Sequence, residues 1–197
     1  MNGLNEAFFG RSVHDVARDL IGCTLLAGDC GGLIVETESY HRDDPACHAY
    51  VGRTARCSVL FGPPARAYVY LSYGIHSLLN AVAEGEGEAA AVLIRALEPT
   101  VGIEQMQRRR GRDRLDDLCS GPGKLAEALG VGLEHNDTSL LEPPFAVLDR
   151  VDRRTEVEVV TGPRIGITKA VSYPWRFCLA GSRFVSRPWP SETRAAA

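Results

Sequence analysis

Residues 35–40 have the sequence Val35-Glu36-Thr37-Glu38-Ser39-Tyr40, and the remaining segments of the chain are best interpreted from this stretch. An apolar run and a glycine pair precede it, so the segment is predicted to be a strand whose end leaves the core. Residues two apart share one face of a strand. Glu36, Glu38 and Tyr40 are therefore expected on one side, and that side is too polar for an ordinary core strand.

Two interpretations of this polar face are open from the segment alone. Exposed glutamates are common on a solvent-facing edge strand, where they need no special explanation. Alternatively, the end of the strand holds a carboxylate in position to activate a water molecule.

Length and composition indicate one ordinary globular domain of 197 residues, with 45% hydrophobic and 24% charged residues. The net charge of −3 does not indicate a nucleic-acid binder, although a sum over the chain says nothing of a local basic face. No run of eighteen apolar residues and no signal peptide is present, so we expect a cytoplasmic protein that does not enter membranes. The six cysteines lack the spacing of a metal site, and no metal is expected.

A second segment, residues 67–80, carries aromatic side chains at strand spacing. Tyr68 and Tyr70 alternate with aliphatic residues, and Tyr73-Gly74 then forms a turn before an apolar antiparallel partner. Cross-strand packing is a common explanation for such tyrosines. A tyrosine at the tip of a glycine turn is exposed, however, and cannot belong to a core.

The apolar run 89–97 is interrupted by Arg95. This run is predicted to be a strand buried on both faces, so the arginine is directed inward and needs an anion. Glu36 and Glu38 are the expected partners. The long polar segment 41–67 carries His48 and several arginines, and loops of this length inside compact domains are usually functional.

Capping residues and turns indicate the other elements. Ser12 opens a capping-box pattern before a helix, and residues 23–27 and 33–40 form a predicted hairpin. Ser120 is the expected cap of a later helix, whose N–H groups can bind a phosphate oxygen. Further strands are predicted at 145–150, 156–161 and 175–180, and residues 188–197 are expected to form a frayed tail.

Five motifs occur in order along the chain. They are Glu36-Thr37-Glu38-Ser39-Tyr40, Gly52-Arg53-Thr54 after His48, Tyr68-Val69-Tyr70-Leu71-Ser72-Tyr73-Gly74 through Asn80, Arg95-Ala96-Leu97-Glu98-Pro99, and Cys119-Ser120-Gly121-Pro122 with Lys124-Leu125. Together they resemble the alkyladenine (3-methyladenine, or N-methylpurine) DNA glycosylase family, over about residues 9–186. The resemblance implies an α+β fold in which one domain, residues 1–197, is built on a curved, mainly antiparallel sheet with surrounding helices. The hairpin-rich pattern favours the same architecture.

The resemblance also implies an activity. It is that of a monofunctional glycosylase, which flips alkylated or deaminated purines out of duplex DNA and hydrolyses their N-glycosidic bond, initiating base excision repair. The purines of this class are 3-methyladenine, 7-methylguanine, hypoxanthine and ethenoadenine. The expected partner is double-stranded DNA containing such purines, bound by a monomer. No lyase activity, metal or other cofactor is implied.

Site residues follow from the resemblance position by position. Glu38 is the expected general base, and Arg95 is expected to hold the attacking water and the carboxylate. The expected base pocket consists of Tyr40, His48, Tyr70 and Asn80. The expected DNA contacts are Tyr73, as a wedge in the space left by the base, with Arg53, Arg56, Tyr68, Ser120, Gly121 and Lys124.

The residue types agree with this chemistry. A flipped base needs aromatic faces, and an N-alkylated purine is cationic, so electron-rich tyrosine rings add a cation–π attraction. Two other functions fit part of the sequence. An inverting glycoside hydrolase could use Glu36 and Glu38 as its acid and base, and a non-catalytic module could recognise damaged or bent DNA. The hydrolase leaves the exposed Tyr73 unexplained.

Overall fold

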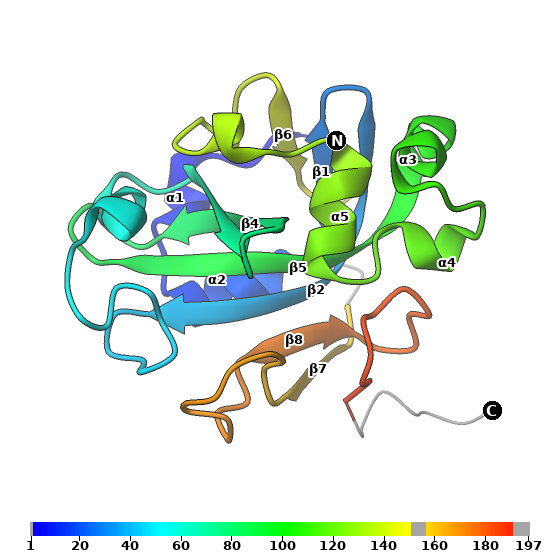
Figure 1. The fold of residues 1–197 in the computed structure, drawn as a ribbon. Helices are drawn as coiled ribbons and strands as arrows, with labels where there is room; N and C mark the ends of the chain where they lie inside the picture. The colour runs from blue at the N-terminus through cyan, green and yellow to red at the C-terminus, as the bar shows by residue number, and fades with distance from the viewer. Residues whose placement is uncertain (1, 151–156, 191–197) are drawn as a thin grey trace.

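The computed structural model describes residues 2–150 and 157–190, in which helices surround a curled sheet (Figure 1). The helical segments are α1 (Glu6–Phe9), α2 (Val13–Asp19), η1 (Ala55–Phe61), α3 (Ile103–Arg110), α4 (Leu115–Leu118), α5 (Pro122–Leu129) and η2 (Leu133–His135). The strands are β1 (Thr24–Ala27), β2 (Cys30–His41), β3 (Ala67–Ser72), β4 (His76–Ala83), β5 (Ala90–Val101), β6 (Phe145–Leu148), β7 (Val159–Gly162) and β8 (Arg176–Leu179).

The strands of the described residues pair into one eight-stranded sheet. Its main path has the order β3-β4-β5-β2-β1-β6, while β8 pairs with both β2 and β7. Every pairing among these strands is antiparallel. The predicted α+β fold with a curved, mainly antiparallel sheet is therefore confirmed.

Strand β2 is the element that most of the sheet shares. One of its edges pairs with β5, and the other pairs first with β1 and then with β8. Glu36 and Glu38 are consequently internal, and both have an exposed fraction of 0%. The alternative of a solvent-facing edge strand is wrong.

Alternation along β5 separates two sides of the sheet. Val92 and Ile94 belong to the main hydrophobic core, which also contains the buried faces of α2 and α5. Ala91, Leu93 and Arg95 face the other side, where they line a cavity. A single strand thus contributes to both the core and the site.

The capping box predicted for the first helix does not form. Ser12 is the N-cap of α2, but its side chain makes no capping hydrogen bond. Instead, the Val13 N–H donates to Glu84 Oε1 across 2.9 Å. A carboxylate from the β4–β5 turn therefore does what local sequence spacing assigned to Ser12 and Asp15.

The later strands appear where the sequence predicts them, with shorter bounds in β6, β7 and β8. Residues 191–197 of the predicted frayed tail lie outside the described residues. Pro188 and Trp189 are hydrogen-bonded, to Arg176 and to the Val185 carbonyl respectively, so fraying is wrong for these two. Within residues 2–150 and 157–190, no helix has the length and apolar character to cross a bilayer.

Gly32 allows the backbones of β2 and β5 to come close together. A β-carbon built on it would lie 2.1 Å from the Glu98 carbonyl oxygen. We expect Gly32→Ala to lower the free energy of unfolding by about 1–3 kcal/mol, because the two strands must move apart. Gly85→Ala is the matched control, since a β-carbon there meets nothing within 4 Å. Urea denaturation followed by circular dichroism measures both, and equal midpoints would contradict the close approach.

Candidate active site

Strand register brings four residues from distant parts of the sequence into one row across the sheet. Tyr68 is opposite Asn80, Asn80 is opposite Leu93, and Leu93 is opposite Glu38. Side chains directly opposite one another in antiparallel strands share a face. The period of two in each strand therefore assembles the tyrosine, amide and carboxylate side chains that the sequence singled out.

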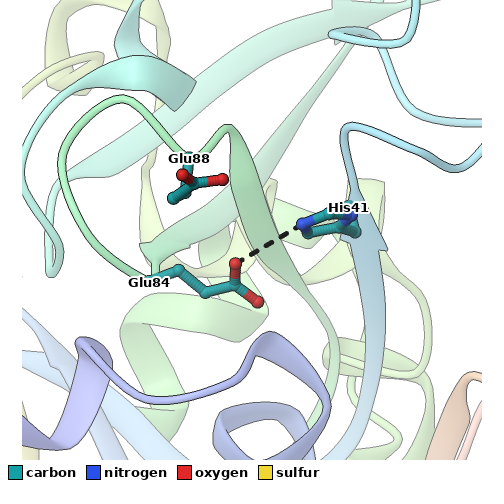
Figure 2. Close-up of side chains that lie close together, drawn as sticks. All are labelled: His41, Glu84 and Glu88. Atoms are coloured by element: carbon teal, nitrogen blue, oxygen red, sulfur yellow. Dashed lines mark ion pairs between the residues drawn. The ribbon is translucent and has the colours of Figure 1, made fainter.

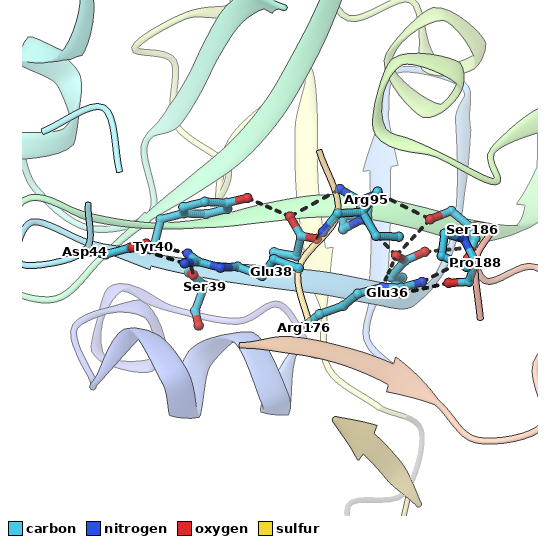
Figure 3. Close-up of polar contacts among 11 residues, drawn as sticks. Glu36, Glu38, Ser39, Tyr40, Asp44, Arg95, Arg176, Ser186 and Pro188 are labelled. Atoms are coloured by element: carbon cyan, nitrogen blue, oxygen red, sulfur yellow. Dashed lines mark hydrogen bonds and ion pairs between the residues drawn. The ribbon is translucent and has the colours of Figure 1, made fainter. Parts of the chain in front are cut away.

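Glu38 is held by three donors (Figure 3). The Tyr40 hydroxyl donates to Oε2 at 2.7 Å, and Arg95 Nη1 lies 3.2 Å from the same oxygen. The Ile165 backbone N–H donates to Oε1 at 2.7 Å. An ionised carboxylate offers about four acceptor positions, so roughly one acceptor position of Glu38 is left for a water molecule.

Glu36 is held by four donors, three of them on one of its oxygens. Its Oε1 accepts from Arg95 Nε at 2.8 Å, Arg176 Nε at 2.7 Å and the Ser186 hydroxyl at 2.9 Å. Its Oε2 accepts from the Ser186 N–H at 2.7 Å. The two arginines and Ser186 thus anchor Glu36 within the buried network.

A cavity of about 690 Å³ opens in front of this network. We call it the aromatic cavity, and its volume is in the range of small-molecule sites. Glu38 is not part of its lining, but Tyr40 and Arg95, which contact Glu38, both are. The predicted pocket residues His48, Tyr70 and Asn80 also line it.

The aromatic wall of the cavity is held by ring contacts and one hydrogen bond. The His48 and Tyr70 ring centroids are 4.5 Å apart in an edge-to-face arrangement, and those of Tyr68 and Tyr70 are 5.3 Å apart. His48 Nδ1 lies 2.9 Å from the Tyr68 hydroxyl. Burial lowers the pKa of His48 below its ordinary value, and the nearby Arg56 lowers it further. The imidazole is therefore mainly neutral at pH 7.

The Asn80 side chain is held by hydrogen bonds to two backbone carbonyls. Its amide nitrogen donates to the Tyr68 carbonyl at 3.0 Å and to the Leu78 carbonyl at 3.4 Å. The side chain is buried and yet lines the aromatic cavity. Asn80 therefore makes backbone contacts and also has the cavity position expected of it.

The rim of the cavity carries exposed apolar and cationic side chains. Tyr73 is 89% exposed at the β3–β4 turn, as expected for a turn tip. Arg56 also lines the cavity and lies over the Tyr70 ring, at 5.5 Å from its centroid. Arg53 is exposed and lies 5.8 Å from the Phe61 ring centroid.

Two expectations about DNA-facing residues need correction. Tyr68 is only 2% exposed, and it belongs to the cavity wall instead of the outer surface. Ser120 does not cap α5, because Gly121 is the N-cap and Ser120 pairs with Ala96 in a short β-bridge. Lys124 is on the first turn of α5, where its ammonium group already lies 3.3 Å from Asp117.

The sequence interpretation missed the segment 163–169 altogether. Residues 165–169 line the aromatic cavity, and the Ile165 N–H contacts Glu38. The segment contacts Glu38 through a backbone N–H, which no residue type in the sequence indicates. Arg164 and Asp44 are buried charged residues, but the burial of a single loop residue cannot be predicted from the sequence.

One cluster in the described residues has the side chains of a metal site. Ligand atoms of His41, Glu84 and Glu88 all lie within 4.8 Å of one another (Figure 2). Each already has a partner: His41 Nε2 is 3.5 Å from Glu84, and Glu88 is 3.1 Å from Arg42. An ion-pair network accounts for these contacts, and the cluster is separate from the lining of the aromatic cavity.

The chain is similar to one family of known proteins. The family model described as methylpurine-DNA glycosylase matches residues 7–183. A protein of Rhodopseudomonas palustris strain HaA2 is 61% identical over 94% of this chain and 91% of its own length. Others from Bradyrhizobium diazoefficiens and Nitrosospira multiformis are 58% and 55% identical, over 95% and 92% of this chain and 92% of each relative. All three are named as 3-methyladenine DNA glycosylases.

Proposed function

The chain belongs to the methylpurine-DNA glycosylase family, and from this premise we propose that it flips alkylated or deaminated purines out of duplex DNA and hydrolyses their N-glycosidic bond. The proposed substrate class is 3-methyladenine, 7-methylguanine, hypoxanthine and ethenoadenine. In this proposal Glu38 activates the attacking water, and the reaction initiates base excision repair.

The observation that carries the proposal is the difference between the two buried glutamates. The three donors of Glu38 all belong to residues that line the aromatic cavity. Of the partners of Glu36, Arg176 and Ser186 are not part of that lining. Arg95 contacts both carboxylates, so it fixes the orientation of Glu38 relative to the cavity. A single oriented carboxylate is what a water-activating mechanism requires.

The aromatic cavity supports the proposed substrates. Tyr40, Tyr70 and His48 supply ring faces and edges to a flipped base. A purine alkylated on a ring nitrogen is cationic, and tyrosine faces attract cations. His48 is mainly neutral because its pKa is lowered, so it does not repel a cationic base.

The glycoside-hydrolase alternative is disfavoured by the same geometry. An inverting pair needs one carboxylic acid and one carboxylate, each in contact with the substrate or its water. Glu36 is bound by Arg95, Arg176 and Ser186, and the last two are not part of the cavity lining. Membership of a glycosylase family likewise favours an enzyme over a non-catalytic DNA-binding module.

Glu38→Gln tests the proposed function directly. We expect it to lower the single-turnover rate of base release by about 10²–10⁴-fold, because the amide keeps the shape but cannot accept a proton from water. Release of free base from alkylated duplex DNA, with EDTA present, measures the effect. Binding to lesion-containing DNA is expected to stay near that of the parent protein.

Glu36→Gln is the matched control on the same strand face. It is expected to lower the free energy of unfolding by about 3 kcal/mol, because two guanidinium groups lose their buried counter-charge. The protein that remains folded is expected to release bases far better than Glu38→Gln. An inactive Glu36 variant beside an active Glu38 variant would reverse the assignment.

Tyr73 is proposed to fill the space that a flipped base leaves in the duplex. Tyr73→Ala is expected to weaken binding to lesion-containing DNA by about 1–3 kcal/mol, the scale of a lost base–aromatic stack. Stability should not change, because the side chain is 89% exposed. Val101→Ala, another exposed apolar residue, is the control. Equal affinities of the parent and Tyr73→Ala, measured by fluorescence anisotropy, would remove Tyr73 from the interface.

Asn80 is proposed to exclude normal guanine by filling the space that the guanine 2-amino group needs. Its amide nitrogen is already bonded to backbone carbonyls, so the exclusion acts chiefly through volume. Asn80→Ser frees that volume and is expected to allow measurable release of undamaged guanine, first from mispairs that flip easily. Excision of hypoxanthine serves as the positive control for folding. A variant that excises hypoxanthine but leaves guanine untouched would refute the filter.

A further inference from the structure

A buried ion pair joins two loops that lie 120 residues apart in the sequence. Arg164 Nη2 donates to Asp44 Oδ1 at 3.0 Å, and Arg164 Nη1 contacts Asp44 Oδ2. The side chains of both residues are 0% exposed. The pair is therefore a two-pronged arginine–carboxylate contact in the interior, the arrangement with the most defined geometry among ion pairs.

Asp44 organises the loop that carries His48. Its Oδ1 also accepts the Ala46 N–H at 3.0 Å, and its carbonyl accepts the Cys47 N–H at 2.8 Å. Residues 45–48 follow directly and line the aromatic cavity. The position of this cavity wall therefore depends on where Asp44 is held.

Arg164 contacts strand β2 and directly precedes the cavity-lining residues 165–169. Its Nη1 donates to the Ser39 carbonyl at 3.0 Å, on β2 between Glu38 and Tyr40. Its guanidinium carbon lies 4.5 Å from the Tyr40 ring centroid and 5.0 Å from that of Trp175. The arginine thus covers one face of the Tyr40 ring, so a flipped base can stack only on the other face.

Ile165, the residue after Arg164, connects the ion pair to Glu38. The Ile165 N–H donates to Glu38 Oε1 at 2.7 Å, and residues 165–169 line the aromatic cavity. Figure 3 shows Asp44, Tyr40 and Glu38 along one stretch of β2 and the loop that follows it. A shift of Arg164 would move a donor of Glu38, one ring of the cavity and both of its loops together.

Stability alone does not account for this pair. Buried ion pairs are often no more stabilising than apolar residues of the same volume, and the Arg164 Nε–H has no hydrogen-bond partner among the described residues. An unpaired buried donor carries a free-energy cost. An ion pair that carries this cost is consistent with a role in positioning the segments that it joins.

We propose that the Arg164–Asp44 pair is a positioning device for base excision, which sets the Ile165 N–H against Glu38 and fixes the Tyr40 ring and the His48 loop. This inference rests on the proposed function. Neither residue is proposed to touch the flipped base or the attacking water. Arg164→Lys keeps the charge but loses the planar fork and the stacking surface, so it is the informative substitution.

Single-turnover excision of hypoxanthine from duplex DNA is the first test. Arg164→Lys is expected to be slower than the parent by about 10–100-fold, the scale of a displacement near 1 Å in an active site. Its affinity for undamaged DNA should be unchanged. Phe145→Leu is the stability control, because Phe145 is a buried core residue of the edge strand β6. An equal loss of rate in both variants would assign Arg164 a merely structural role.

Asp44→Asn and the double variant complete the cycle. If the two residues act as one device, the double variant is no slower than the slower single variant. If the rate losses of the two single variants multiply in the double variant, the proposal is overturned.

Amide hydrogen exchange at Ile165, measured without DNA, tests the device independently of activity. Exchange should rise by at least about tenfold in Arg164→Lys and not in Phe145→Leu. Unchanged exchange would refute the positioning role even if the rate fell. A parent protein that releases no base would refute the proposed function, and the exchange result would still decide whether Arg164 holds the Ile165 N–H.

Discussion

The guanidinium of Arg95 lies between two buried carboxylates, and the arrangement of the site depends on this contact. Its Nε is 2.8 Å from Glu36 and its Nη1 is 3.2 Å from Glu38. Burial alone disfavours the charged form of Arg95, but the two carboxylates outweigh it and raise its pKa. Arg176 supplies the second cation, so two negative and two positive side chains balance in the buried interior.

Alternation and turns predicted the part of this arrangement that comes from consecutive strands. Glu36 and Glu38 share a face because they are two residues apart, and Tyr68 and Tyr70 share one for the same reason. Short hairpins then fix the register, because each turn determines which residues of the two strands meet. The inward direction of Arg95 was predicted because this charged residue interrupts an apolar run. The hairpins and the shared strand faces were therefore predictable from local pattern, whereas the β2–β5 pairing that places Glu38 opposite Leu93 joins distant segments.

Contacts made by backbone groups from distant segments could not be predicted in this way. The Ile165 N–H contacts Glu38, and the Ser186 N–H contacts Glu36, from segments 127 and 150 residues further along the chain. A backbone donor leaves no residue type to recognise. The same limit explains the first helix, where Glu84 satisfies the Val13 N–H in place of Ser12. The local sequence identified the start of the helix correctly, but the acceptor of the Val13 N–H comes from a distant turn.

The aromatic rings of the cavity wall are the feature that suits the proposed cationic leaving group. Both glutamates are buried behind Tyr40 and Arg95, and neither lines the aromatic cavity. In the proposed function, a cationic base would be attracted by the π electrons of the tyrosine rings, and His48 is mainly neutral. An alkylated purine would depart readily without being protonated by the protein. The proposed role of the protein is then to orient one water molecule, and the three donors that hold the Glu38 carboxylate favour that role.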